Sequence, residues 1–121
     1  TNRLGQLLIA RFMQSGALPA HIEQLRQHYR SKRDDMQRLL SEHLPKEVSW
    51  QLPAGGMLFW LTLSIDCQHL LQQGIENGVV VLPGSSFAVA AEGNYCLRLS
   101  FSQISLPEME EGIKRLVALL S

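Results

Sequence analysis

The sequence predicts an α/β fold, a two-layer domain in which helices pack on one face of a small mixed or antiparallel sheet. Apolar residues recur at helical spacing near both ends of the chain, and short alternating or wholly apolar segments lie between them. Glycine and proline separate these segments into pieces of strand or helix length. The predicted order is a pair of helices followed by β-β-α-β-β-α. A chain of 121 residues is long enough for one compact domain with a core.

The composition excludes several classes of protein. Apolar residues make up 45% of the chain, and 11 basic residues balance 11 acidic ones, which argues against a dedicated nucleic-acid or anionic-membrane surface. No apolar run approaches the roughly 20 residues of a membrane span. Neither the two cysteines nor the four histidines show a metal-ligand spacing, so we expect no metal site and two reduced thiols in a cytoplasmic protein.

Four helices are predicted from periodicity and end signals. The first carries Leu4, Leu7, Leu8 and Phe12 and ends at Ser15 and Gly16; the second runs from about residue 20 to residue 44, where Pro45 ends it. Its apolar stripe contains Ile22, Leu25, Tyr29, Met36, Leu40 and Leu44. The third follows Asp66, with Leu70, Leu71 and Ile75 on its inner face. The last begins at a capping box of Ser105 and Glu108, and its buried stripe is Met109, Ile113, Leu116, Val117 and Leu120.

Four strands are predicted between the helices. Residues 48–52 alternate between apolar and polar, which indicates a half-buried strand, whereas residues 57–63 are apolar on both faces and indicate a central strand. Residues 79–82 form a short β-branched run closed by a Pro-Gly turn. A flexible loop over residues 88–94 leads into the alternating segment 95–101.

Arg98 is the strongest candidate for a binding residue. It interrupts a strand whose alternate residues, Leu97 and Leu99 among them, are apolar, and it therefore lies on the opposite face with Cys96 and Ser100. A guanidinium held by a strand presents a rigid fork that matches a carboxylate in a bidentate manner. An arginine in a strand can also pair with a nearby Asp or Glu or reach solvent, so spacing alone leaves both interpretations open.

Two glycine-containing segments are further candidates. Residues 53–57 (PAGGM) precede the central strand, and the paired Gly55 and Gly56 permit close backbone approach to a ligand or to another strand. Residues 83–87 (PGSSF) offer hydroxyl and N–H groups that could hold an anion. From sequence alone a plain turn is the favoured explanation of either segment, and neither matches a nucleotide-binding motif.

The order of these segments carries more information than any one of them. A helix with Tyr-x-x-x-Arg-Asp leads to Pro-x-Gly-Gly-Met-x-x-Trp, then to Gly-Val-x-Val-x-Pro-Gly-x-x-Phe, Leu-Arg-Leu-Ser-Phe and a helix with Glu-Glu-Gly-Ile-x-x-Leu. This succession resembles the C-terminal small domain of class I/II aminotransferases of fold type I, which depend on pyridoxal 5′-phosphate. It is also similar to the C-terminal part of MocR/GntR-type transcription regulators.

The resemblance implies a protein with a large and a small domain, of which this chain contains only the small one and the segment that leads into it. Residues 1–18 would be a helical segment arriving from a large cofactor domain, and residues 19–121 would be the small domain. Arg98 would bind the α-carboxylate of an amino acid or 2-oxo acid, with Gly55 and Gly56 lining the cleft. The Schiff-base lysine and most cofactor ligands would lie upstream, so we expect no catalytic residue, no cofactor and no metal in this chain by itself.

Three hypotheses follow from the resemblance. The first is a transaminase, which we expect to be a cytoplasmic homodimer in its full-length form. The second is a regulator whose aminotransferase-like part senses an effector while a separate N-terminal domain binds DNA. The third is a dimerisation module that needs no cofactor. The chain passes directly from Thr1 and Asn2 into a helical pattern, and we therefore expect a piece of a longer polypeptide that is inactive alone.

Overall fold

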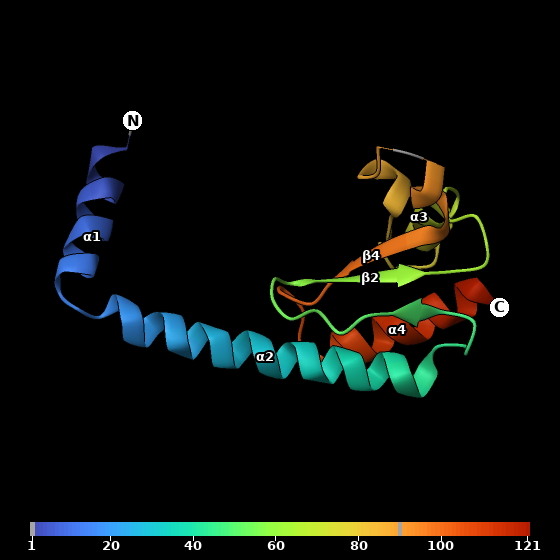
Figure 1. Ribbon diagram of the computed structural model, residues 1–121, viewed down its shortest axis with the longest axis horizontal. Helices are drawn as coiled ribbons and strands as arrows, with labels where there is room; N and C mark the ends of the chain where they lie inside the picture. Colours follow the sequence, from blue (N-terminus) through green and yellow to red (C-terminus); the bar gives the residue numbers. More distant parts are fainter. Residues whose placement is uncertain (1, 90) are drawn as a thin grey trace. The chain divides into compact units, whose positions relative to one another are not determined.

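A computed structural model describes residues 2–89 and 91–121. The predicted order of helices and strands is confirmed, with two 3₁₀ turns added. The elements are α1 (Arg3–Gln14), α2 (Leu18–His43), β1 (Ser49–Trp50), β2 (Leu58–Thr62), α3 (Leu70–Glu76), β3 (Leu82–Pro83), η1 (Gly84–Ser86), η2 (Ala91–Tyr95), β4 (Cys96–Ser100) and α4 (Leu106–Leu120) (Figure 1). The chain divides into two compact units, Thr1–Ser31 and Lys32–Ser121, and each is described by itself.

The first unit contains α1 and the beginning of α2. Asn2 caps α1, since its side-chain Oδ1 accepts a hydrogen bond from the Gly5 N–H at 2.9 Å. The helix ends where predicted, because Gly16 takes a positive φ of 77° that few other residues adopt. The Phe12 ring meets the His21 ring edge-on, with centroids 5.8 Å apart. The large apolar residues of α1 are exposed, and Leu4 is 68% accessible.

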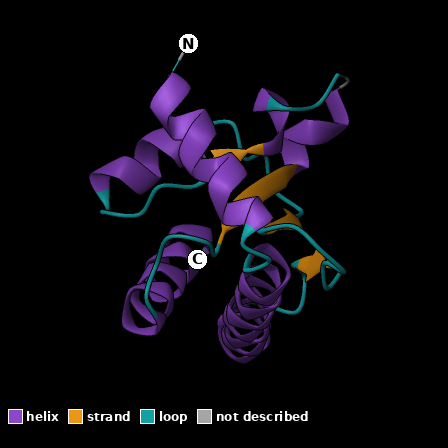
Figure 2. Cartoon of the chain, turned by 90° about the vertical axis from the view of Figure 1, so that its left-hand side faces the viewer, coloured by secondary structure: helices purple, strands orange, loops and turns teal. Residues whose placement is uncertain are grey.

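The second unit is built on an antiparallel sheet of four strands in the order β1-β2-β4-β3, whose strands lie side by side in Figure 2. β2 lies between β1 and β4, as its apolar composition predicts. β4 is flanked by β2 and β3, so Arg98 pairs with Trp60 on one side and with Leu82 on the other. A residue with neighbours on both sides is held firmly in register.

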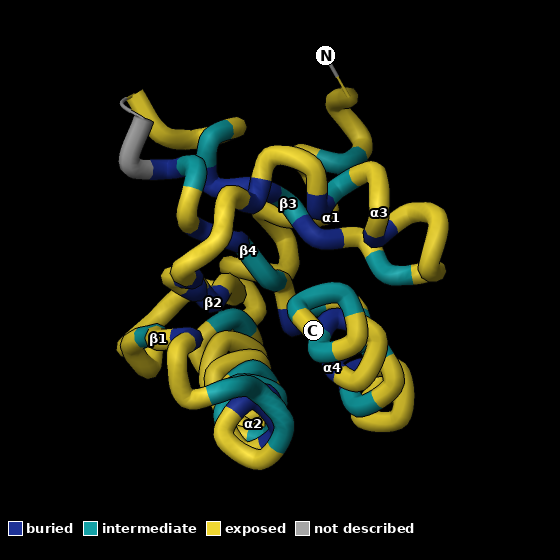
Figure 3. The backbone as a smooth tube through the Cα atoms, turned by 90° about the vertical axis from the view of Figure 1, so that its right-hand side faces the viewer, coloured by how far each residue is buried: buried dark blue, intermediate teal, exposed yellow. Residues whose placement is uncertain are grey.

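The core lies between one face of this sheet and two helices, α4 and the C-terminal part of α2 (Figure 3). The fully buried strand residues Phe59, Leu61 and Leu97 form its sheet side together with Phe101, which follows β4 directly, and the ring centroids of Phe59 and Phe101 lie 5.7 Å apart. Helix residues complete it: Met36, Leu39, Leu40, Met109, Ile113 and Leu116. The predicted two-layer α/β class, with helices on one face, is therefore confirmed.

Three local predictions are wrong. Asp66, expected to cap the third helix, does not do so: α3 has His69 at its N-cap position, and the Asp66 Oδ1 accepts a hydrogen bond from the Gln68 N–H at 2.8 Å instead.

Residues 79–81 are not paired as a strand, and only Leu82 and Pro83 join the sheet. The Val79 N–H instead bonds the Gly74 carbonyl at 2.8 Å, which holds this segment at the end of α3. Ile75 does not face inward; it is exposed, and Gly74 occupies the buried position, where a side chain would strike the Val79 carbonyl.

Two adjacent cationic residues of α2, Lys32 and Arg33, donate hydrogen bonds to two loops of the second unit. The Lys32 Nζ donates to the carbonyls of Ser102 and Ile104 at 3.0 and 2.8 Å, and the Arg33 Nη1 donates to the Pro53 carbonyl at 3.3 Å. These bonds link α2 to the segments that follow β4 and precede β2.

Among the described residues, no helix has the length and apolar character that crossing a membrane requires.

Candidate functional site

Arg98 lies on the face of the sheet opposite the core. Its neighbour Leu97 and the later residue Phe101 are completely buried, whereas Arg98 is only partly buried. Since successive side chains of a strand point to opposite faces, Arg98 projects away from α2 and α4. The register adds Trp60 as its direct neighbour on β2. The prediction that Arg98 stands on the non-core face of its strand is confirmed.

The Arg98 guanidinium rests on an aromatic ring. Its Cζ lies 3.7 Å from the centroid of the Phe87 ring. A cation over an aromatic face is attracted by the ring quadrupole, which contributes about 0.5–1 kcal/mol at an exposed site. Phe87 is 46% exposed, so this contact lies at the surface of the second unit and not in its core.

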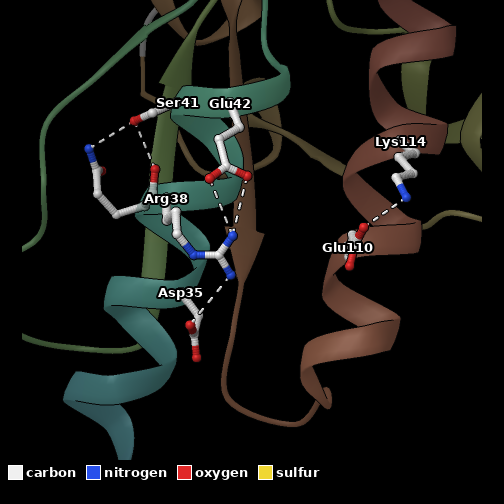
Figure 4. Close-up of polar contacts among 7 residues, drawn as sticks. Asp35, Arg38, Ser41, Glu42, Glu110 and Lys114 are labelled. Atoms are coloured by element: carbon white, nitrogen blue, oxygen red, sulfur yellow. Dashed lines mark hydrogen bonds and ion pairs between the residues drawn. The ribbon is translucent and has the colours of Figure 1, made fainter.

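Arg98 differs from the other arginines of the second unit in having no carboxylate partner among the described residues. Arg33 binds Asp34 at 2.7 Å, and Arg115 binds Glu111 at 2.8 Å. Arg38 lies between Asp35 and Glu42, as the dashed lines in Figure 4 show. The interpretation of Arg98 as a member of an internal ion pair is therefore not supported, and its fork of N–H groups remains available to an anion.

The turn over residues 83–87 places the Phe87 ring. The N–H groups of Phe87 and Ala88 both donate to the Gly84 carbonyl, at 2.9 and 3.0 Å. Gly84 is pressed against β4: a Cβ there would lie 2.7 Å from the Cys96 Cβ and 2.9 Å from the Trp60 Cζ2. Glycine is required by this close approach, which brings Phe87 back over β4. The contact that this turn contributes to the site is the Phe87 ring over the Arg98 guanidinium; an anion held by the turn stays a prediction.

Gly55 and Gly56 form an open turn at the end of the sheet beyond Arg98. A Cβ added at either glycine would meet no heavy atom within 4 Å, and Gly56 takes a positive φ of 77°. Leu58, two residues later, pairs with Ser100 and not with Arg98. The structure thus leaves room beside the turn, and the role of these glycines in lining a cleft stays a prediction.

The cysteines have no catalytic arrangement among the described residues. Burial raises the pKa of the Cys67 thiol to about 11, and the nearby Cys96 and Asp66 act in the same direction. A thiol with this pKa stays protonated and unreactive at neutral pH. A cluster of three or more histidine, cysteine or acidic groups able to hold a metal ion is likewise absent from the described part of the chain.

The three lysines do not fit the role of a cofactor-binding amine. Lys32 is held by two backbone carbonyls, and Lys114 pairs with Glu110 at 2.8 Å (Figure 4). Hydrogen bonding to that carboxylate raises the pKa of Lys114, the opposite of what a nucleophilic amine requires. Lys46 is exposed in the turn that follows α2. None of them lies beside Arg98 in the sheet.

A cavity of about 300 Å³ opens on the other side of the sheet, between residues 78–81 and α4. Its walls are mostly apolar and include Met36, Leu99, Met109 and Ile113. Because Leu99 and Arg98 point to opposite faces of β4, this cavity does not contain the Arg98 guanidinium.

Reasoning from the sequence missed Phe87. Phe87 is the final position of the Val-x-Val-x-Pro-Gly-x-x-Phe segment, but the sequence of this segment predicts only a turn or an anion site. The missing information is that Gly84 packs on β4, which depends on contacts between residues distant in sequence.

Comparison with known proteins shows similarity to aminotransferases over nearly the whole chain. The family model for class I and II aminotransferases matches residues 3–116. The aromatic-amino-acid aminotransferase 1 of Thermococcus litoralis is 34% identical over 118 residues, which cover 96% of this chain and 28% of that protein. The uncharacterized HTH-type transcriptional regulator YdfD of Bacillus subtilis is 30% identical over 118 residues, which cover 96% of this chain and 24% of that protein.

A solved structure shows the same fold. The kynurenine aminotransferase of Pyrococcus horikoshii, crystallised in complex with PMP, matches with a TM-score of 0.86 and 37% identity. The match covers 98% of this chain and 30% of that one. The chain thus spans less than a third of the length of each of these relatives.

Proposed function

Because this chain belongs to the class I and II aminotransferase family, we propose that it serves as the C-terminal small domain of a longer aminotransferase-like protein. In this role Arg98 binds the α-carboxylate of an amino acid or 2-oxo acid. The chain alone does not catalyse transamination; it supplies the group that holds the substrate by its acid end.

The observation that carries the proposal is the Arg98 guanidinium on the non-core face of β4, which has no carboxylate partner among the described residues. The described carboxylates near other arginines of the second unit form ion pairs with them, whereas Arg98 is left with an aromatic ring as its partner. A planar guanidinium with free N–H groups binds a carboxylate through two parallel hydrogen bonds. β2 and β3 pair with β4 on both sides and fix the backbone of Arg98, so the guanidinium extends from a rigid element.

The proposed cofactor is pyridoxal 5′-phosphate, which withdraws electrons from the substrate when it is bound. PMP is bound in the kynurenine aminotransferase of P. horikoshii. The proposal that the attachment lysine lies elsewhere is supported by the bonds of two lysines of this chain: Lys32 donates to two backbone carbonyls, and Lys114 pairs with Glu110. We therefore assign the attachment lysine and most phosphate ligands to a large domain outside these 121 residues. This assignment is why the isolated chain is expected to be inactive.

A second function is favoured by one observation, the match to the HTH-type regulator YdfD over 96% of the chain. In a regulator, Arg98 would bind the carboxylate of an effector, and a separate N-terminal domain would bind DNA. The sequence preceding this chain discriminates between the two functions, because a basic winged-helix segment followed by a linker marks the regulator. A full-length protein that shows no absorbance band of bound cofactor would instead support a dimerisation module.

Substitution of Arg98 in the full-length protein tests the proposal. Arg98→Ala removes a charge-paired contact and should cost roughly 2–4 kcal/mol, which corresponds to a loss of kcat/KM of about 30- to 900-fold. For a regulator, the affinity for the effector should fall instead. Arg38→Ala is the matched control, since Arg38 is an exposed, ion-paired arginine on α2 and should leave kcat/KM unchanged. An unchanged kcat/KM and unchanged effector affinity in Arg98→Ala would remove Arg98 from the site.

A further inference from the structure

We propose that Phe87 is a positioning residue for Arg98: its ring holds the guanidinium in the orientation that receives a carboxylate. This inference rests on the proposed function, in which Arg98 is the carboxylate ligand. It adds a residue to that site and gives the position of the ring over the guanidinium a defined physical task.

The first step is the geometry of the contact. With the Arg98 Cζ 3.7 Å from the ring centroid, the Phe87 ring covers one side of the guanidinium. The N–H groups of a guanidinium lie in its own plane, and not on the side that the ring covers. A ring that lies parallel to this plane orders the group without occupying the donors that a carboxylate needs.

The second step is the absence of another restraint. Among the residues that the structure describes, no side chain forms an ion pair or hydrogen bond with the Arg98 guanidinium. A long arginine side chain without a partner samples many rotamers, and fixing it on binding costs conformational entropy. A ring that already holds the group reduces this cost before the ligand arrives.

The third step is that the turn over residues 83–87 determines the position of the Phe87 ring. Gly84 contacts β4 at Cys96, two residues before Arg98, and the Gly84 carbonyl accepts the Phe87 N–H. The ring is thereby attached to the same strand that carries the arginine. Because Phe87 is 46% exposed, burial in the core does not explain its place.

The simplest alternative is that the ring provides only apolar contact area. Leucine would then replace phenylalanine without loss, because it is also apolar and of similar size. If the flat π-face orders the guanidinium, tyrosine will replace phenylalanine and leucine will not. Phe87→Leu and Phe87→Tyr therefore form a matched pair of variants.

A double-mutant cycle in the full-length protein tests the inference. We expect Phe87→Leu to raise the KM for an amino-acid substrate, or the Kd for a carboxylate effector, by about 2- to 5-fold, and Phe87→Tyr to keep the wild-type value. In the Arg98→Ala background, Phe87→Leu should have no further effect, because the ring acts through the arginine. An equal loss from Phe87→Leu with and without Arg98 would overturn the inference.

A spectroscopic measurement keeps the test independent of catalysis. A guanidinium over an aromatic face experiences the ring current, so the Arg98 Hε resonance of the 121-residue chain should be shifted in the wild type and in Phe87→Tyr. It should move to the position of an unstacked arginine in Phe87→Leu. An Hε resonance that is the same in all three proteins would contradict the contact itself.

The outcomes separate this inference from the function on which it rests. If Arg98→Ala leaves carboxylate binding unchanged, the proposed function fails. The effect of Phe87→Leu is then the same with and without Arg98. If Arg98→Ala weakens binding but Phe87→Leu does not, Arg98 keeps its role and the positioning role of Phe87 is overturned.

Discussion

The two faces of β4 differ in what surrounds them. On one face, Leu97 and Phe101 are completely buried against Phe59, Leu61 and the helices. On the other, Arg98 lies partly exposed with a partly exposed ring as its contact. Because side chains alternate along a strand, neighbouring residues of β4 lie on opposite faces. We therefore expect substitutions on the core face to change the free energy of unfolding, and substitutions on the Arg98 face to change carboxylate binding.

The largest expected effect on stability comes from the core face. Phe101→Ala removes a fully buried ring that meets Phe59, and it should lower the free energy of unfolding by about 3–5 kcal/mol. Arg98→Ala, on the other face, should lower it by less than about 1 kcal/mol, since a surface cation–ring contact contributes little. Urea unfolding of the 121-residue chain measures both values. Similar losses in the two variants would show that the faces are not separate in function.

Gly84→Ala should lower the free energy of unfolding by an intermediate amount. It should also displace the Phe87 ring on the face of β4 that carries Arg98. The new Cβ would lie within 2.8 Å of the Gly93 carbonyl and 2.7 Å of the Cys96 Cβ, so the turn must move away from β4. Overpacking of this kind costs about 1–3 kcal/mol. We expect both a lower midpoint of urea unfolding and a displaced Arg98 Hε resonance. Loss of stability with an unchanged resonance would mean that the turn does not place the Phe87 ring.

An effect on stability smaller than that of Gly84→Ala is expected far from either face, at the start of α4. The Glu108 carboxylate accepts hydrogen bonds from the Ser105 hydroxyl and N–H at 2.6 and 2.7 Å, and these bonds lower the pKa of Glu108. The contribution of the ionised carboxyl is present above its ordinary pKa and is lost as pH falls through the lowered value of the folded state. Ser105→Ala should cost about 1 kcal/mol at pH 7.

Thermal unfolding at pH 7 and at pH 3 measures this dependence. The difference between wild type and Ser105→Ala should shrink at the lower pH, because protonation of Glu108 weakens the same pair of hydrogen bonds. A difference that is equal at both pH values would show that Ser105 acts without the Glu108 carboxylate. Carboxylate binding at Arg98 should be unaffected by this variant at pH 7.

The sequence was sufficient to place Arg98 on the correct face. Alternation around Leu97 and Leu99 depends only on the period of a strand, and the capping box of α4 depends only on local spacing. The central position of β2 also follows from its composition, because apolar residues on both faces favour a position inside the sheet over one at its edge. These features are local, and they are confirmed.

Features that depend on packing between distant segments could not be predicted. The β-branched residues 79–81 favour a strand, but the hydrogen bond from Val79 to Gly74 fixes them at the end of α3. Val80 is consequently 69% exposed. In the same way, the contact between Phe87 and Arg98 depends on how closely Gly84 approaches β4, and no spacing in the sequence encodes that distance.

The most direct test of the carboxylate site compares two substrates of the full-length protein in the wild type and in Arg98→Ala. One is an amino acid, and the other is an amine with the same side chain that lacks the carboxylate. We predict that Arg98→Ala lowers kcat/KM for the amino acid by about 30- to 900-fold and leaves the value for the amine nearly unchanged. An equal loss for both substrates would contradict the account, because Arg98 would then support the fold or the chemistry without binding the carboxylate.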